Sequence, residues 1–289
     1  MLDKKLSSFH KIFIYLVLIS IGFILFAPFL YMLSISLAGP ERNIIQNFTL
    51  FPKEFYWKNY VKLFGNLFGG EYPIGRWFLN TMLVVVLSIV GQIWSSSFVA
   101  YGFAKMQYKH KNFFFLLLLS TMMLPGQITL IPVFIIFRNI GLYNTLWPLI
   151  IPQFFGSAYN IFFTRQFMTA IPGSLYEAAE LDGLNYFGIY RKIVLPLIKP
   201  ALAAIAIFTF NWAWGDLMGP LIYISDASKM TLALGAANLS AATNPSGAIN
   251  TSVVMALSFC LSIPQIAIYF FGQKYLFNLN LGIGNSGSK

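Results

Sequence analysis

A short polar stretch of this 289-residue chain lies at positions 177–196, between two long apolar stretches. Ser174 and Glu177 have the Ser-x-x-Glu spacing of a capping box, in which a serine begins a helix and a glutamate reaches back to it. The sequence places beside Glu177 neither a second acid spaced for hydrolysis nor a paired His/Cys metal site. The chemistry predicted for this group is therefore binding, by a small charged helix that fits a groove on a partner.

The same stretch predicts two short helices. The first helix runs over about residues 175–182 and stops at Gly183, because glycine readily adopts the left-handed conformation of a helix C-cap. Asn185 caps the second helix, which is expected to end at Arg191 and Lys192. One face of the first helix is shared by Leu175, Ala178, Ala179 and Asp182. The two alanines make that face flat, so another surface can approach it closely.

Composition places these helices in a membrane protein. The chain is 57% hydrophobic and only 10% charged, whereas soluble domains carry about 25% charged residues. The net charge of +10 is spread over the ends of apolar stretches, so membrane lipid is an expected partner and nucleic acid is not. The single cysteine, Cys260, excludes an intrachain disulfide. His10 and His110 stand beside lysines and are expected near headgroups rather than as metal ligands.

Six apolar stretches are long enough to cross a bilayer as helices. They are Ile12–Leu37, Phe78–Phe103, Phe113–Phe137, Leu146–Phe163, Ala201–Ile224 and Ser252–Phe271. The first is too long for the apolar region of a signal peptide. Pro125 and Pro132 predict a broken third span, which with Gln127 and Thr129 is expected to line a pore. The expected fold is thus an all-α integral membrane protein with six transmembrane helices.

The distribution of basic residues orients these spans. With the N-terminus in the cytoplasm, twelve of the 19 Lys and Arg residues lie inside, and five of the others fall in one long outer loop. The expected parts are a cytoplasmic N-terminus at 1–11, a first span at 12–37, an outer loop at 38–77, a five-span core at 78–273 and a cytoplasmic tail at 274–289. A cytoplasmic helix–glycine–helix loop at 170–196 joins spans four and five, and residues 225–251 are expected to form a flexible outer finger.

The loop resembles a motif of ABC importer permeases. The Glu-Ala-Ala triplet at 177–179, Gly183 and the Leu-Pro pair at 195–196 have the order and spacing of the segment that couples these permeases to their ATPases. The resemblance implies that Glu177 meets a cationic side chain in a groove of the ATPase. The implied coupling residues are Glu177, Ala178, Ala179, Asp182, Gly183, Leu195 and Pro196. Helix signals alone leave a second interpretation, a surface turn in which Glu177 only caps its helix.

Other segments resemble the carbohydrate (maltose-type) branch of these permeases, over nearly the whole chain from residue 78 onward. The segments are Asn80-Thr81, Ala100–Lys105, Gly141–Thr145, Arg165–Phe167, Ile171-Pro172, Trp214–Leu217 and Gly219–Leu221. Two positions depart from the pattern. Gly215 stands where the family often has asparagine, and the tail at 279–284 matches the usual glycine-rich ending only loosely.

Span five also carries polar and aromatic residues suited to contact with a solute. The candidate pathway residues are Asn211, Trp212, Trp214 and Asp216, together with Gln127 of the third span. Tryptophan rings stack on the C–H faces of a sugar, and a carboxylate accepts its hydroxyl protons. The alternative is an interfacial tryptophan belt, with Asp216 at the outer headgroups because Gly219 and Pro220 end the helix. The residues alone leave both interpretations open.

These features predict a permease subunit of an ATP-driven importer for a sugar or oligosaccharide, in a bacterial or archaeal cell membrane with both termini cytoplasmic. The sequence lacks the Gly-x-x-x-x-Gly-Lys-Ser/Thr loop that cradles ATP, so this chain is expected to be no enzyme and to bind no cofactor or metal. The resemblance implies two ATPase subunits that bind ATP and Mg, a homologous sister permease, and an extracytoplasmic solute-binding protein touched by the outer finger. An ABC permease for a polyamine, anion or peptide, an autonomous secondary carrier or channel, and a scaffold remain alternatives.

Overall fold

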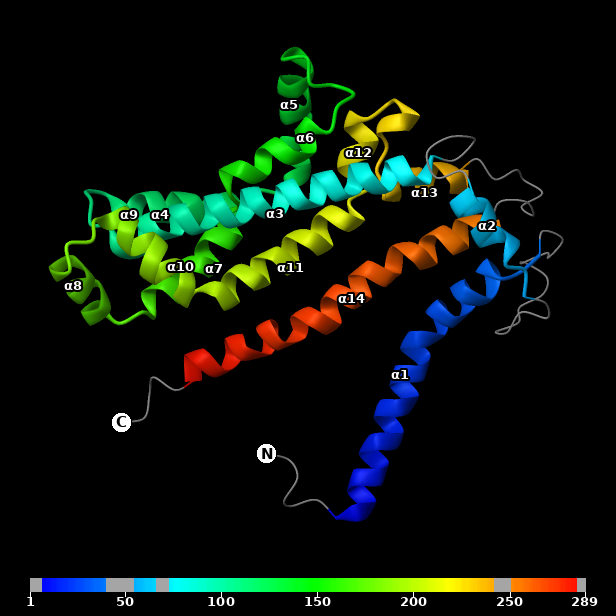
Figure 1. Cartoon of the computed structure of the whole chain (residues 1–289), viewed down its shortest axis with the longest axis horizontal. Coiled ribbons are helices and arrows are strands. Elements are labelled where there is room, and N and C mark those ends of the chain that lie inside the picture. Colours follow the sequence, from blue (N-terminus) through cyan, green and yellow to red (C-terminus); the bar gives the residue numbers. More distant parts are fainter. Residues whose placement is uncertain (1–6, 40–54, 66–72, 242–250, 285–289) are drawn as a thin grey trace. The chain divides into compact units, whose positions relative to one another are not determined.

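The computed structural model describes residues 7–39, 55–65, 73–241 and 251–284, and within these ranges the chain forms helices and loops without a β-strand. It divides into two compact units, one of residues 1–74 with 236–263 and one of residues 75–235 with 264–289. Figure 1 follows the helices along the chain.

The helices are α1 Ser8–Ser36, α2 Lys58–Gly65, α3 Ile74–Lys105, α4 Lys111–Ser120, α5 Gly126–Asn139, α6 Trp147–Ile150, α7 Ala158–Thr169, α8 Gly173–Leu181, α9 Tyr186–Ile189, α10 Leu195–Leu197, α11 Lys199–Gly215, α12 Met218–Tyr223, α13 Leu232–Ala241 and α14 Thr251–Gly284. Short 3-10 turns lie at η1 Thr121–Met123, η2 Ile151–Phe155 and η4 Ala227–Lys229, and a π-helical turn at η3 Tyr190–Val194.

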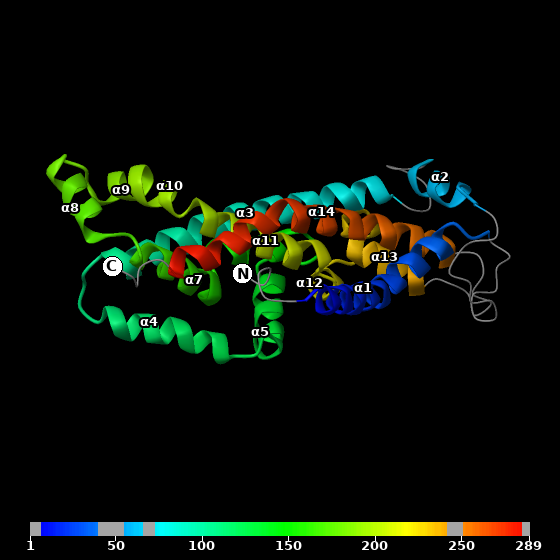
Figure 2. The ribbon, with the colours of Figure 1, turned by 90° about the horizontal axis from the view of Figure 1, so that it is seen from below.

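Within the described ranges, three helices are long and apolar enough to cross a bilayer, namely Phe9–Ser36, Ile74–Lys105 and Thr251–Lys274. They correspond to the first, second and sixth predicted spans. Two further stretches meet the same criterion only as bent pairs, residues 111–139 with a bend of 97° and residues 186–215 with a bend of 75°. The first bend confirms the break predicted in the third span, and Figure 2 shows α4 and α5 meeting at it.

The predicted fourth span, residues 146–163, is not one continuous helix. α6 is followed by the 3-10 turn η2, and Gly156 has a left-handed φ of 75° before α7 begins. Ser95 Oγ of α3 donates to the freed carbonyl of Gln153 (3.2 Å), whose side chain accepts from Gln92 Nε2 (2.8 Å). A break inside an apolar stretch is tolerated here because side chains of α3 replace the lost helical partners.

In the first unit, α2 packs on the end of α1. Asn59 Nδ2 donates to the carbonyls of Ser36 and Ala38, each at 2.9 Å. The Tyr60 hydroxyl forms a hydrogen bond of 2.7 Å with Ser36 Oγ. The predicted first outer loop therefore contains a short helix, and part of that loop lies outside the described residues.

The flexible finger expected at 225–251 is instead partly helical, although its segment 242–250 lies outside the described residues. α13 accounts for its second part, and the first part is tied to the start of α3. Asn80 Nδ2 donates to the carbonyls of Ser228 (3.0 Å) and Met230 (2.9 Å). The abundance of small residues suggested flexibility, but small side chains here permit close packing.

Gly235→Ala should lower the stability of the chain. Gly235 of α13 lies against Trp77, whose indole nitrogen donates to the Ala227 carbonyl at 2.8 Å, and an added Cβ would overlap the ring. Since overpacking costs about 1–3 kcal/mol, the midpoint of thermal unfolding in detergent should fall by several degrees. Gly102→Ala is the control, because a Cβ there meets no atom within 4 Å. A midpoint no lower for Gly235→Ala than for Gly102→Ala would contradict this packing.

Candidate functional site

α8 carries the Glu177 motif at one end of the second unit, beyond the end of α3 (Figures 1 and 2). The helix begins at Gly173, so Ser174 lies inside its first turn rather than at the cap. Pro172 takes the cap position with a φ of −55°, and its carbonyl accepts the Leu175 N–H at 3.3 Å. The predicted capping box is therefore wrong, because the fixed φ of proline starts the helix earlier.

Gly183 ends α8 as predicted, with a left-handed φ of 79°. Its N–H donates to the Glu180 carbonyl, and the Leu184 N–H donates to the Ala179 carbonyl, each at 3.0 Å. These two hydrogen bonds form a Schellman motif, which glycine permits without strain.

Asn185 begins α9 as predicted, since its Oδ1 accepts the Gly188 N–H at 2.8 Å. The second helix is longer than expected. It continues through the π-helical turn η3 into α10, so Arg191 and Lys192 lie inside a turn and do not end a helix. The chain then bends by 75° into α11.

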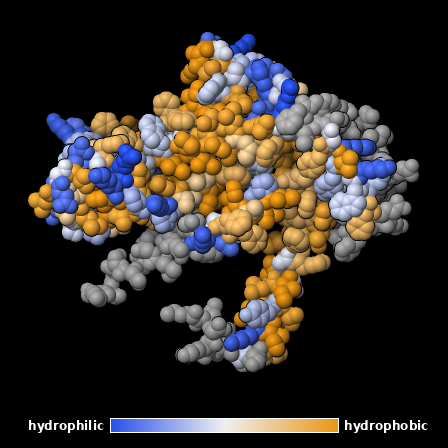
Figure 3. Space-filling view, in the orientation of Figure 1, coloured by the Kyte–Doolittle hydropathy of each residue, from blue (hydrophilic) through white to orange (hydrophobic). Residues whose placement is uncertain are grey.

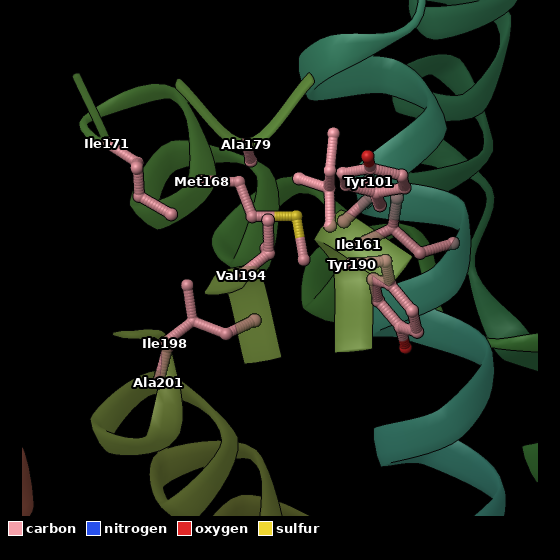
Figure 4. Packing of buried hydrophobic residues seen from close by; sticks show 11 residues of the cluster. Tyr101, Ile161, Met168, Ile171, Ala179, Tyr190, Val194, Ile198 and Ala201 are labelled. Atoms are coloured by element: carbon pink, nitrogen blue, oxygen red, sulfur yellow. The ribbon is translucent and has the colours of Figure 1, made fainter. Parts of the chain in front are cut away.

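A buried hydrophobic cluster joins α8 to the long helices (Figure 4). Its members are Ala100, Tyr101, Ile161, Met168, Ile171, Ala179, Ile189, Tyr190, Val194, Ile198 and Ala201. They come from α3, α7, the turn between α7 and α8, α8 and the segment from α9 to α11. Leu195 packs against the cluster, whereas Pro196 is exposed. The loop is therefore packed on several helices rather than hanging from one.

The four residues of the face predicted for the first short helix differ in burial because of this cluster. Ala179 is buried in it, whereas Leu175, Ala178 and Asp182 are exposed. The expectation that both alanines flatten an exposed face is therefore wrong for Ala179, because the loop folds back on α3. Leu181 is apolar and yet 89% exposed at the end of α8. Figure 3 shows hydrophilic residues gathered around this end and hydrophobic residues over the middle of α3 and α11.

The end of α3 contacts the loop both before and after α8. The Tyr101 hydroxyl donates to the Tyr186 carbonyl of α9 at 3.0 Å, and Lys105 Nζ donates to the Ile171 carbonyl at 3.1 Å. Lys105 Nζ also lies 3.9 Å from the ring centroid of Tyr176 in α8, a cation–π distance. In the sequence, the segment Ala100–Lys105 was indicated only by its resemblance to the family. No local residue pattern predicts which loop atoms the end of a helix contacts.

A cavity of about 210 Å³ opens between α3 and the loop. It is lined by Tyr101, Lys105, Gly173, Tyr176, Glu177, Glu180, Tyr186 and Ile189. Glu177 and Glu180 are exposed, so their carboxylates can meet a positive charge on a partner. The Tyr176 hydroxyl is buried and forms no hydrogen bond with any residue in the described part of the chain. Burial raises the pKa of Tyr176 above its ordinary value, so the side chain stays neutral at physiological pH.

Two of the predicted pathway residues, Trp214 and Asp216, are buried or half-buried. The predicted span at 201–224 is two helices, since α11 ends just before Asp216. Asp216 Oδ1 accepts the Gly219 N–H at 3.1 Å, at the start of α12. Trp214 is buried and stacks on Phe210 with 5.3 Å between ring centroids.

The other three predicted pathway residues are exposed. Asn211 and Trp212 lie near the end of α11, and Gln127 lies in the first turn of α5. Asn211 Nδ2 donates to the Ile207 carbonyl of its own helix at 3.0 Å. A solute contact by any of the five residues stays a prediction.

Comparison with known proteins identifies the family. Residues 92–275, more than half of the chain, match the model of the family described as binding-protein-dependent transport system inner membrane component. The chain belongs to this family. The resemblance found in the loop is thereby confirmed, and so is the assignment to a multi-pass membrane protein that is a transport component.

Individual relatives of this inner membrane component cover most of its length. It is 30% identical over 268 residues to the probable ABC transporter permease protein YurM of Bacillus subtilis, with 91% of this chain and 83% of that protein covered. It is 32% identical over 266 residues to the arabinooligosaccharides transport system permease protein AraQ of Halalkalibacterium halodurans, with 90% and 92% covered.

A solved structure shows the same fold. A chain from the crystal structure of a bacterial ABC transporter involved in the import of the acidic polysaccharide alginate matches with a TM-score of 0.80 and 24% identity. The match covers 94% of this chain and 99% of that chain.

Proposed function

We propose that this inner membrane component is the permease subunit of an ATP-driven importer, and that α8 docks on its ATPase. The observation that carries the proposal is an exposed glutamate, Glu177, on a short helix that a buried cluster joins to the long helices. Two ATPase subunits bind ATP and Mg, a sister permease completes the pathway, and an extracytoplasmic protein delivers the solute. The loop at 170–196 and both termini face the cytoplasm, and six spans cross the membrane, with 78–273 as the five-span core.

α3 carries the movement of the loop into the membrane. A partner shifts a conformational equilibrium only by as much as it binds the two states differently. The ATP-bound ATPase must therefore favour one position of α8. α3 follows that position because Lys105 donates to the Ile171 carbonyl before α8 and Tyr101 donates to the Tyr186 carbonyl after it. α11 follows because the loop leads directly into it along the chain.

The proposed solute is a sugar or oligosaccharide. One relative is named for arabinooligosaccharides, and the structural relative belongs to a transporter that imports alginate. The exposed Trp212 offers a ring for stacking on a sugar, and Asn211 and Gln127 offer side-chain amides for its hydroxyls. Trp214 and Asp216 lie next to Asn211 and Trp212 along the chain, where Trp214 stacks on Phe210 and Asp216 accepts the Gly219 N–H at the start of α12.

Reconstitution tests this function. The full chain should co-purify with a sister permease and an ATPase, and the ATPase rate would be measured with the binding protein and a panel of sugars, polyamines, anions and peptides. Stimulation by one or more carbohydrates is expected. Stimulation only by another class would overturn the assigned solute, and uptake into liposomes by the lone chain would overturn the dependence on ATP.

A further inference from the structure

A basic cavity lies where the loop after α3 leads into α4. Its volume is about 590 Å³, and its lining residues are Ala104, Lys105, Gln107, Tyr108, His110, Lys111 and Asn112. Two lysines, a histidine and two side-chain amides line it, and no carboxylate does. These are the hydrogen-bond donors and charges that recognise an anion.

The cations around this cavity have no acidic partner within the described residues. Lys111 lies close enough to Lys105 and to Arg165 for their positive charges to repel. Lys111 Nζ donates to the Met106 carbonyl at 2.9 Å, and Arg165 Nε donates to the Phe103 carbonyl at 3.2 Å. These contacts offset the negative end of the α3 dipole. Lys111 Nζ also donates to the Ala104 carbonyl at 3.5 Å, which leaves one of its three N–H donors for an anion that would relieve the repulsion.

The helix that leaves the cavity is apolar on its exposed surface. α4 has no buried residue. Its exposed large hydrophobic residues are Phe113, Phe114, Leu116 and Leu117. A cationic cavity continuous with an apolar helix suits a molecule that has an anionic head and apolar tails. Free phosphate would use only the first of these two surfaces.

We propose that the cavity binds the phosphate of an anionic phospholipid whose acyl chains lie along α4. Lys105 and Lys111 provide positive charge, while Gln107, His110 and Asn112 provide hydrogen bonds. The site lies at the membrane surface where a span begins, the depth at which phospholipid headgroups are found. Lys105 also lines the cavity beside Glu177, so the variants that test the lipid site leave Lys105 unchanged.

Native mass spectrometry of the purified full chain tests this site. The wild-type chain should retain phosphatidylglycerol in preference to phosphatidylcholine. Asn112→Asp places a carboxylate in the cavity without removing a cation, and should weaken phosphatidylglycerol binding about tenfold. Lys109→Gln is the control, because it changes the net charge equally in the same loop but Lys109 does not line the cavity. It should weaken binding by less than about twofold.

Three outcomes would overturn the proposal. The first is equal weakening by Asn112→Asp and Lys109→Gln, because binding would then depend on overall charge alone. The second is equal retention of phosphatidylglycerol and phosphatidylcholine by the wild-type chain. The third is that inorganic phosphate raises the thermal unfolding midpoint as much as phosphatidylglycerol does. Unfolding midpoints in phosphatidylcholine confirm that each variant is folded, and Gln107→Glu repeats the test if Asn112→Asp does not fold.

Discussion

Replacing Glu177 by lysine should leave membrane insertion unchanged and reduce solute uptake at least about tenfold. Glu177 is exposed on α8 and lines the cavity between α8 and α3. Truncating one partner of a buried interfacial ion pair costs about 2–5 kcal/mol, and two like charges add repulsion. Docking of the ATPase should weaken accordingly. Uptake and ATP hydrolysis would be measured in reconstituted vesicles, together with the abundance of the chain in the membrane.

Glu180→Lys is the matched control for this variant. Glu180 is exposed, lies one turn further along α8 and lines the same cavity, so the substitution makes the same charge change at nearly the same place. Uptake should stay within about twofold of wild type, because an exposed charge contributes little by itself. Wild-type uptake in Glu177→Lys, or an equal loss in both variants, would remove the specific role of Glu177.

The second large effect is expected at the end of α3. Lys105→Met should leave ATPase docking intact but lower uptake about tenfold and remove the response of the ATPase to solute. Methionine keeps an apolar stem and loses both the 3.1 Å hydrogen bond to the Ile171 carbonyl and the cation–π contact with Tyr176. A hydrogen bond to a charged group contributes about 1.5–3 kcal/mol, and a cation–π contact about 0.5–2 kcal/mol. α3 would then follow α8 less closely.

Two further variants separate this role from a general loss of stability. Lys105→Arg should restore most of the uptake, because a guanidinium also donates to a carbonyl and stacks on an aromatic ring. Tyr176→Leu should reduce uptake, and combining it with Lys105→Met should cost less than the sum of the two if the residues act as a pair. Normal uptake in Lys105→Met, or a loss that tracks only a lower unfolding midpoint, would exclude transmission through this contact.

Much of the candidate site was predictable from residues that act on backbone groups close to them in the sequence. Gly183 and Asn185 set the end of α8 and the start of α9, since each acts on backbone groups within five residues. Ser174 failed as a cap for an equally local reason, because Pro172 starts the helix first.

Breaks inside apolar stretches were harder to predict. The bend in the third span was predictable from Pro125 and Pro132. The fourth stretch is long and mostly apolar, which predicts one span, although it contains Pro148, Pro152 and Gly156. Gly156 and the freed carbonyl of Gln153 are tolerated only because Ser95 of another helix lies opposite. That partner is 58 positions away in the chain, so no local pattern indicates it.

By itself the sequence determined that this protein resides in a membrane, that it belongs with permeases of binding-protein-dependent transport systems, and that it carries a short charged helix between apolar stretches. Hydropathy and motif spacing are properties of residues close together in the chain, so they can be read without coordinates. Only the tertiary structure decided that Ala179 is buried and that Lys105 reaches the loop. Lys105 and Ile171 are 66 positions apart, and their contact exists only because packing of the intervening helices brings the two ends together.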